Sequence, residues 1–193
     1  MKPKVLLFFV LVSVILSGCS GSNNNAVGQK DKETSDTITL DKVDSNVLDD
    51  NLCNEKEDLL FSFKIANSNQ TASICISKDE QEYIIYRFGT KDKIELEYPI
   101  ETEKSWSLFT YSYYLRAGGI DNEGLDLNYL CFEHDGYSYE IYDEYSAESD
   151  KSVVGIKITN QDTKEETNNL GDSDSIIGSL ISLRDNTKIK IIE

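Results

Sequence analysis

The chain has 193 residues, and its 35 acidic side chains outnumber 19 lysines and arginines, giving a formal net charge of −16 at pH 7. This balance excludes nucleic acid as a partner, because phosphate binding requires a basic face. It also disfavours contact of the folded part with anionic lipid headgroups, and is typical of a soluble surface or one that attracts a basic protein. The length corresponds to one domain with a sizeable core.

Residues 1–18 predict a lipoprotein signal peptide. A basic start is followed by an uncharged run over residues 5–16, and Leu16-Ser17-Gly18-Cys19 matches a lipobox, in which the Cys19 thiol receives the lipid. A transmembrane anchor and a secretory signal with an incidental cysteine are the alternatives, but the apolar run is shorter than the about 20 residues of a span. We therefore expect a lipid-anchored protein of the bacterial cell envelope. Because Ser20 follows the cysteine, we expect the outer membrane if the cell is Gram-negative.

Residues 19–50 predict a lipidated cysteine followed by a disordered tether. Ser, Gly, Asn, Asp and Lys dominate this segment and leave little apolar surface to bury. About 30 flexible residues reach roughly 30 Å, which would hold a domain clear of the membrane. The signal peptide contains two lysines and no acid, so the chain after it has 17 basic and 35 acidic side chains and a formal charge of −18.

Residues 51–193 predict a single all-β domain. Short alternating stretches separated by polar turns indicate about eight to ten strands, which we expect to form one antiparallel barrel or sandwich. A short C-terminal helix over residues 175–183 is a further expectation, although Gly178 and the serines weaken it. In the stretch 94–98, spacing by two predicts that Ile94, Leu96 and Tyr98 face the core while the two glutamates face water.

Three cysteines follow the lipobox. In the oxidising compartment that export implies, a pair of them tends to be bridged, and Cys53, Cys75 and Cys131 allow three pairings. We favour Cys53–Cys75, because Cys131 shares a strand face with the apolar residues of its own stretch, as a core residue does. A buried free cysteine packs as a small hydrophobe.

No residue set predicts a catalytic or metal centre, and no cofactor is expected. The single histidine, His134, lies in an Asp-Gly turn, which disfavours histidine-dependent nucleophiles and zinc sites. Hydrolysis of glycans by carboxylates alone needs only two acids about 5–10 Å apart. With 35 acids the composition neither favours nor excludes such a pair.

The loop over residues 116–124 is the best candidate for a specific binding surface. It combines a guanidinium, glycines that free the backbone and an acid–amide pair: Arg116, Gly118, Gly119, Asp121 and Asn122. The alternative is an ordinary connection between two strands. Its acids lack the spacing of an EF-hand calcium loop, so no metal is expected there.

Three stretches carry a resemblance: Tyr86-Arg87-Phe88-Gly89, Ile94-Glu95-Leu96-Glu97-Tyr98-Pro99 and Phe109-Thr110-Tyr111-Ser112-Tyr113-Tyr114-Leu115-Arg116. With them, the part from Cys53 to Ile192 resembles a set of small bacterial lipoproteins to which no activity is attached, so no functional residue is implied. In size, anchoring and expected β-architecture the chain is also similar to envelope inhibitors of c-type lysozyme. This second likeness concerns architecture alone.

Together these features predict a non-enzymatic envelope lipoprotein whose β-domain binds another protein. The acidic charge favours a basic partner, and the more specific hypothesis is protection against a basic cell-wall hydrolase or toxin. The alternatives are a carboxylate-dependent hydrolase of envelope glycans and a structural or assembly lipoprotein.

Overall fold

The computed structural model describes residues 51–119 and 122–192, which form an all-β domain as predicted. The predicted signal peptide, the lipidation site Cys19 and the tether up to residue 50 lie outside the described residues, as does Asp121 of the candidate loop. Within the described part of the chain, no helix has the length and apolar character needed to cross a membrane.

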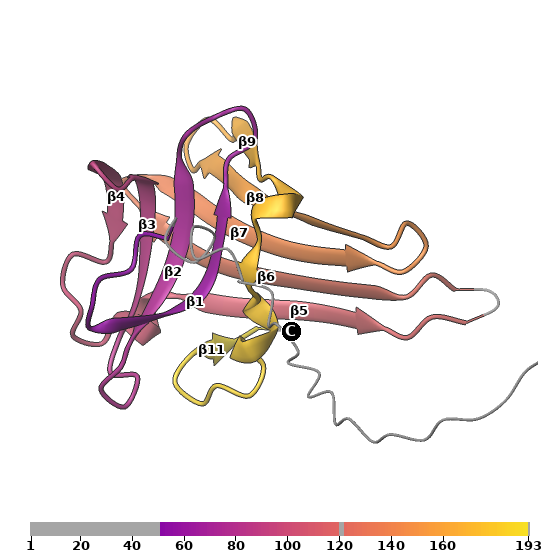
Figure 1. Cartoon of the computed structure of the whole chain (residues 1–193), viewed down its shortest axis with the longest axis horizontal. Helices are drawn as coiled ribbons and strands as arrows, with labels where there is room; N and C mark the ends of the chain where they lie inside the picture. The colour runs from indigo at the N-terminus through magenta and orange to yellow at the C-terminus, as the bar shows by residue number, and fades with distance from the viewer. Residues whose placement is uncertain (1–50, 120–121, 193) are drawn as a thin grey trace, which may run out of the picture. The chain divides into compact units, whose positions relative to one another are not determined.

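Two sheets make up the domain, and they pack face to face as a sandwich (Figure 1). The strands in the described ranges are β1 (Glu57–Lys64), β2 (Thr71–Ser77), β3 (Ile84–Thr90), β4 (Lys93–Tyr98), β5 (Thr110–Arg116), β6 (Leu125–His134), β7 (Tyr137–Ser146), β8 (Lys151–Asn160), β9 (Glu166–Leu170), β10 (Ile177–Gly178) and β11 (Lys190–Ile191). The five-stranded sheet has the order β10-β1-β2-β3-β4, and the six-stranded sheet has the order β11-β5-β6-β7-β8-β9. All pairings are antiparallel except that of β11 with β5.

The hydrophobic core fills the space between the two sheets. Alternation along each strand turns every second side chain inward, as a pleated strand requires. The largest fully buried side chains come from both sheets and from the C-terminal segment: Phe61, Phe63, Ile74, Ile84, Tyr86, Phe109, Tyr111, Leu130, Ile141, Ile156, Leu180 and Leu183. These core residues lie between positions 60 and 189, so the sandwich contains its own hydrophobic core.

The helix expected over residues 175–183 does not form. The segment contains two single 3-10 turns, η2 (Ser173–Ser175) and η3 (Leu180–Leu183), separated by β10. Gly178 of β10 has a φ of 75°, and a Cβ at this position would lie 2.1 Å from the Leu60 carbonyl oxygen. Pairing of β10 with β1 therefore prevails over a helical pattern that is already weakened by glycine and serine.

Two predictions about strand faces are wrong. Cys131 does share a face with Leu125, Leu127 and Tyr129, but this is the outer face of the six-stranded sheet, and all four side chains are partly exposed. The core takes Leu130 and Phe132 from the alternate residues of β6, so apolar residues occur on both faces and alternation alone did not identify the buried one. Ile94 is 39% exposed, because a register shift at Gly89 turns the start of β4 outward, while Leu96 and Tyr98 pack against the core as predicted.

The segment before β1 lies across the outer face of β2 and β3. The disulfide joins Cys53 of this segment to Cys75 of β2, the pairing favoured by the sequence, with 5.6 Å between the two Cα atoms. The Leu52 amide donates a hydrogen bond of 3.0 Å to the Ser73 hydroxyl of β2. Cys131 is free.

Under this segment lies a buried ion pair. Arg87 of β3 donates from Nη1 and Nη2 to the two carboxylate oxygens of Glu57, at 2.5 and 3.0 Å, and from Nε to Glu97, at 2.6 Å. Asn54 and Tyr83 also donate to the Glu57 carboxylate. Burial opposes the charge on Glu57, but hydrogen bonds from Arg87 and Asn54 and the positive charge of Arg87 hold its pKa below the ordinary value.

The six-stranded sheet extends beyond the five-stranded sheet at one end. Strands β6, β7 and β8 have ten residues each, whereas β1 to β4 have six to eight. In Figure 1 the end of β5 and β7 and the start of β6 and β8 pass the five-stranded sheet and finish in two loops. We call this part the projecting end and define it as residues 113–119, 122–128 and 143–153.

Candidate protein-binding surface

The projecting end exposes large apolar side chains on both faces of the sheet. On the inner face, Tyr113 and Leu115 of β5 and Tyr145 of β7 extend past the core and are exposed. On the outer face, Tyr114 of β5, Leu127 of β6 and Val153 of β8 lie in the same row across the strands. Tyr114 is 50% and Leu115 61% exposed, so both faces at this end of β5 are open to solvent.

A polar network attaches the C-terminal segment to the inner face of the projecting end. Arg184, just after η3, donates to the carboxylate of Asp126 and, at 2.8 Å, to the side-chain oxygen of Asn128. Its guanidinium lies 4.7 Å from the centroid of the Tyr113 ring, in cation–π geometry. Burial raises the pKa of Tyr111, so its hydroxyl stays protonated and donates to Asn128 at 2.7 Å.

Asp143 of β7 forms a second attachment to the C-terminal segment. Its carboxylate accepts hydrogen bonds from the Ser179 hydroxyl, at 2.7 Å, and from the Leu180 amide, at 3.0 Å. Ser179 thus starts η3 at the position where β7 leaves the core. The two contacts fix the C-terminal segment against β6 and β7, and this holds the rings at the base of the projecting end in place.

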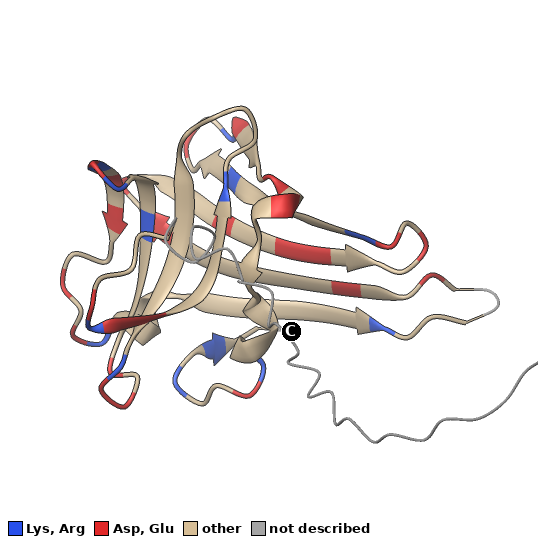
Figure 2. Ribbon diagram, viewed as in Figure 1, with Lys and Arg blue, Asp and Glu red and all other residues tan. Residues whose placement is uncertain are grey.

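Acidic side chains outnumber basic ones on the described part of the projecting end. Figure 2 shows them along β6 and β7 and in the β7–β8 loop. The acids are Glu123, Asp126, Asp143, Glu144, Glu148 and Asp150, against the bases Arg116 and Lys151. Since Asp126 and Asp143 are engaged within the domain, the acids that remain for a partner lie mainly at the tip.

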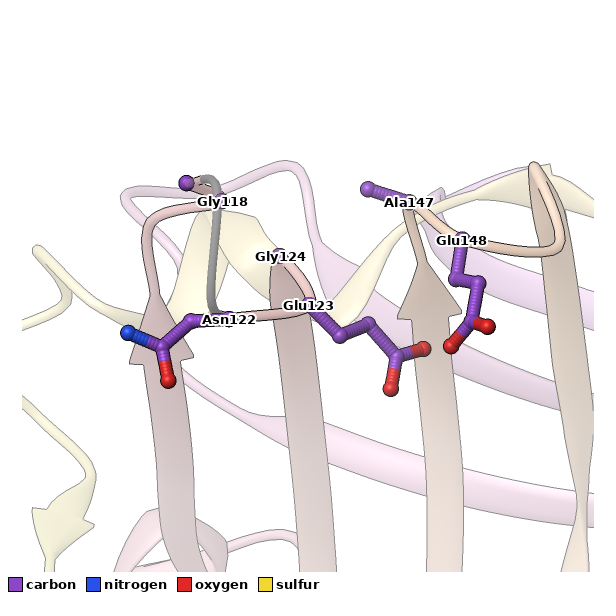
Figure 3. A pocket seen from close by; sticks show the side chains of 7 residues that line it. Gly118, Asn122, Glu123, Gly124, Ala147 and Glu148 are labelled. Atoms are coloured by element: carbon purple, nitrogen blue, oxygen red, sulfur yellow. The ribbon is translucent and has the colours of Figure 1, made fainter.

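The predicted binding loop forms the tip itself, together with the β7–β8 loop. A shallow hollow of about 470 Å³ lies between them and is lined by residues of both loops, among them Gly118, Asn122, Glu123 and Glu148 (Figure 3). The Ala147 amide donates to the Gly124 carbonyl at 2.9 Å and joins the two loops. The candidate loop is therefore half of a two-loop tip.

The structure assigns the predicted loop residues different roles. Arg116 is turned back into the loop, where its Nε donates to the Glu123 carbonyl at 2.8 Å. Gly119 and Asn122 pair with each other across the loop. Neither Gly118 nor Gly119 has a positive φ, and a Cβ at Gly119 would meet nothing within 4 Å, so the expected need for glycine does not hold there.

Three carboxylates of this surface have structural partners within the domain. Glu123 accepts a hydrogen bond from the Ser146 hydroxyl, Asp126 pairs with Arg184, and Asp143 bonds Ser179. Within the described residues, one grouping of potential metal ligands occurs, Cys53, Glu57 and Cys75. Its sulfurs form the disulfide and its carboxylate pairs with Arg87, so these groups are not available to a metal ion.

His134 lies at the other end of the six-stranded sheet, where β6 turns into β7. Its ring contacts that of Tyr98, with centroids 5.3 Å apart, and its Nε2 lies 3.3 Å from the carboxylate of the turn residue Asp135. The histidine is thus remote from the projecting end.

Sequence reasoning placed the surface in the loop and missed the strands behind it. The consecutive residues Tyr113, Tyr114 and Leu115 were the available signal. An apolar residue on both faces of one strand end means that at least one face carries exposed apolar surface unless a second layer covers it. The contribution of Arg184, 58 residues from Asp126, left no local signal.

Comparison of the chain with protein-family models, with curated proteins and with solved structures finds no match.

Proposed function

We propose that this chain is a lipoprotein of the bacterial cell envelope, anchored by lipid on Cys19, whose non-enzymatic β-domain binds another protein through the projecting end. The partner is a basic protein, and a basic cell-wall hydrolase or toxin is the specific candidate. The anchoring part of the proposal depends on the lipobox at Leu16-Ser17-Gly18-Cys19.

The observation that carries the binding function is the exposure of Tyr113, Tyr114, Leu115 and Tyr145 on an extension that the opposite sheet does not cover. Tyrosine is enriched in protein interfaces, because its ring contributes a large apolar area and its hydroxyl a hydrogen bond. Large exposed apolar side chains grouped at one end of a domain are typical of an interaction site.

Charge supports the choice of a basic partner. The tip and the chain as a whole are acidic, so an approaching basic protein is attracted over a Debye length of about 8 Å at physiological ionic strength. This attraction acts mainly on the association rate, while the exposed rings determine the lifetime of the complex.

The test uses a basic c-type lysozyme as the probe, with binding measured by surface plasmon resonance and inhibition measured by turnover of cell-wall substrate. Tyr114→Ala removes the exposed ring of the outer face and should weaken binding by about tenfold or more. Tyr137→Ala is the matched control, because Tyr137 is 40% exposed in the same sheet but at the opposite end. It should change the affinity less than twofold.

A second pair of variants tests the charge contribution. Glu148→Gln with Asp150→Asn should slow association and flatten its salt dependence, whereas Glu101→Gln with Glu103→Gln removes the same charge elsewhere and should do neither. If the lysozyme is neither bound nor inhibited, the lysozyme version of the proposal fails. Release of glycan fragments from peptidoglycan by the protein alone would instead establish a hydrolase.

Anchoring is tested separately with Cys19→Ser. This variant should lose acylation and leave the detergent phase, and a variant that remains there would refute the lipobox assignment.

A further inference from the structure

A partly enclosed cavity of about 190 Å³ lies between the two sheets, away from the projecting end. Apolar side chains supply its walls: Phe88 of β3 and Leu96 of β4 from one sheet, and Ile156 and Ile158 of β8 from the other. Because β4 and β9 are edge strands that both line the cavity, it lies at the open edges of the two sheets, where a small molecule can enter.

One polar group in this cavity has no partner. Tyr86 lines the cavity and as a whole residue is only 1% exposed; no hydrogen bond joins its hydroxyl to another described residue, and the oxygen is not a buried unsatisfied atom, because it remains open to the cavity. Burial, together with the neighbouring Tyr139, raises the pKa of Tyr86 far above its ordinary value, so the hydroxyl keeps its proton. The hydroxyl can therefore donate to an acceptor on a bound molecule, and such a hydrogen bond contributes about 0.5–1.5 kcal/mol.

The surrounding packing holds the polar groups in fixed positions. The ring of Phe132 lies between those of Tyr86 and Tyr139, with centroids 5.2 and 4.7 Å away, and stacks on Tyr139 with an interplanar angle of 4°. Asn169 of β9 adds a partly buried amide to the lining. The cavity thus combines apolar walls with two phenol groups and one amide, and no charged side chain lines it.

We propose that this cavity is a binding site for a small neutral molecule that has one apolar ring or branched chain and one oxygen acceptor, which receives a hydrogen bond from Tyr86. The size supports a single ring, because an apolar cavity of about 150 Å³ holds benzene. A charged ligand is excluded, since a charge buried without a counter-charge is strongly unfavourable. The site is separate from the projecting end, so this inference and the proposed function can fail independently.

The experiment uses p-cresol and toluene, which differ by one hydroxyl group, and the chain from Ser20 to Glu193, which contains the complete core. Binding is followed by amide chemical shifts in two-dimensional NMR. Both probes should shift amides of β3, β4, β7, β8 and β9, and p-cresol should bind more tightly than toluene. In Tyr86→Phe the affinity for p-cresol should fall by about tenfold relative to toluene, since one hydrogen bond is lost.

Two further variants keep the test independent of folding effects. Tyr129→Phe removes a phenol hydroxyl from the outer face, where it donates to Glu144, and should leave both affinities unchanged. Leu96→Phe, at a partly buried position on an edge strand, fills the entrance and should weaken both probes together. Tyr86→Phe itself should be about as stable as the parent chain, because the hydroxyl that it removes has no hydrogen bond to another described residue.

The proposal is overturned if neither probe shifts the amides around the cavity, or if Tyr86→Phe leaves the ratio of p-cresol to toluene affinity unchanged. It is also overturned if Tyr86→Phe clearly lowers stability without ligand, since the hydroxyl would then have a partner within the protein.

Discussion

Removal of the Arg87 guanidinium should be one of the most damaging single changes in the domain. Glu57, its principal partner, has a side chain that is 1% exposed, and Arg87→Met would leave this carboxylate buried without its counter-ion. Breaking a buried ion pair from one side costs about 3–5 kcal/mol. Three donors from Asn54 and Tyr83 would remain on the carboxylate, at 2.7 to 3.1 Å, so we expect the lower part of this range.

The other contacts of Arg87 add little to this figure. Glu97 has a side chain that is 42% exposed, and an ion pair with so much solvent access contributes less than about 1 kcal/mol. The total expected loss for Arg87→Met is therefore about 3–4 kcal/mol. Adding Glu57→Gln to the variant removes the uncompensated charge and should restore at least about 2 kcal/mol of that loss.

Urea unfolding of the chain from Ser20 to Glu193, with the disulfide intact and Trp106 as the fluorescent probe, measures these differences. Lys157→Met is the control, because Lys157 and Glu140 also form a close ion pair, at 2.6 Å, but both side chains are 30% exposed or more. It should cost less than about 1 kcal/mol. If Arg87→Met costs no more than this control, or if Glu57→Gln brings no recovery, the carboxylate does not depend on its buried partner and the reasoning is wrong.

The pH dependence of the same experiment follows from the Glu57 pKa, which lies below its ordinary value in the folded chain. A lowered pKa contributes stability above the pKa of the unfolded chain, and this stability is lost as the pH falls through the folded pKa. The difference in the free energy of unfolding between the parent chain and Arg87→Met should therefore become smaller below about pH 4. A gap of constant size between pH 7 and pH 3 would contradict this.

Three more outcomes are expected. Replacing Cys53 and Cys75 together by Ser removes a disulfide between residues 22 positions apart, and should lower the free energy of unfolding by about 3 kcal/mol in the same urea assay. An unchanged free energy of unfolding would show that the disulfide does not form. Burial, and then the charge of Glu140, raises the pKa of Cys131 to about 12, so iodoacetamide at pH 8 should alkylate it roughly a hundred- to thousandfold more slowly in the folded than in the urea-unfolded chain; equal rates would show an accessible thiolate. Gly155→Ala would place a Cβ 2.2 Å from the buried Tyr142 hydroxyl oxygen and should cost about 1–3 kcal/mol, whereas Gly119→Ala, with open space around it, should stay within about 0.5 kcal/mol, and similar costs for both would argue against this packing.

Local sequence pattern was sufficient to predict the all-β class and most strand positions, whereas the favoured cysteine pair is correct although Cys131 does not face the core as its argument assumed. These features depend on neighbouring residues along the chain: period-two alternation defines a strand, and Asp135-Gly136 defines a tight turn. The alternation did not identify the buried face of a strand when both of its faces carry apolar residues. On β6 both faces carry apolar residues, so only packing against the second sheet determined that Leu130 faces the core and Cys131 faces outward.

The binding surface and the cavity depended on contacts between distant segments. The sequence predicted the loop after β5, but the length difference between the two sheets exposes Tyr113 and Tyr114, and this difference exists only once the sheets are stacked. Likewise, the position of Tyr86 in the cavity wall and the buried pair of Arg87 with Glu57, 30 positions apart, are set by which side chains meet across strands. Alternation determines that a side chain points inward or outward, whereas the tertiary structure alone determines what it meets there.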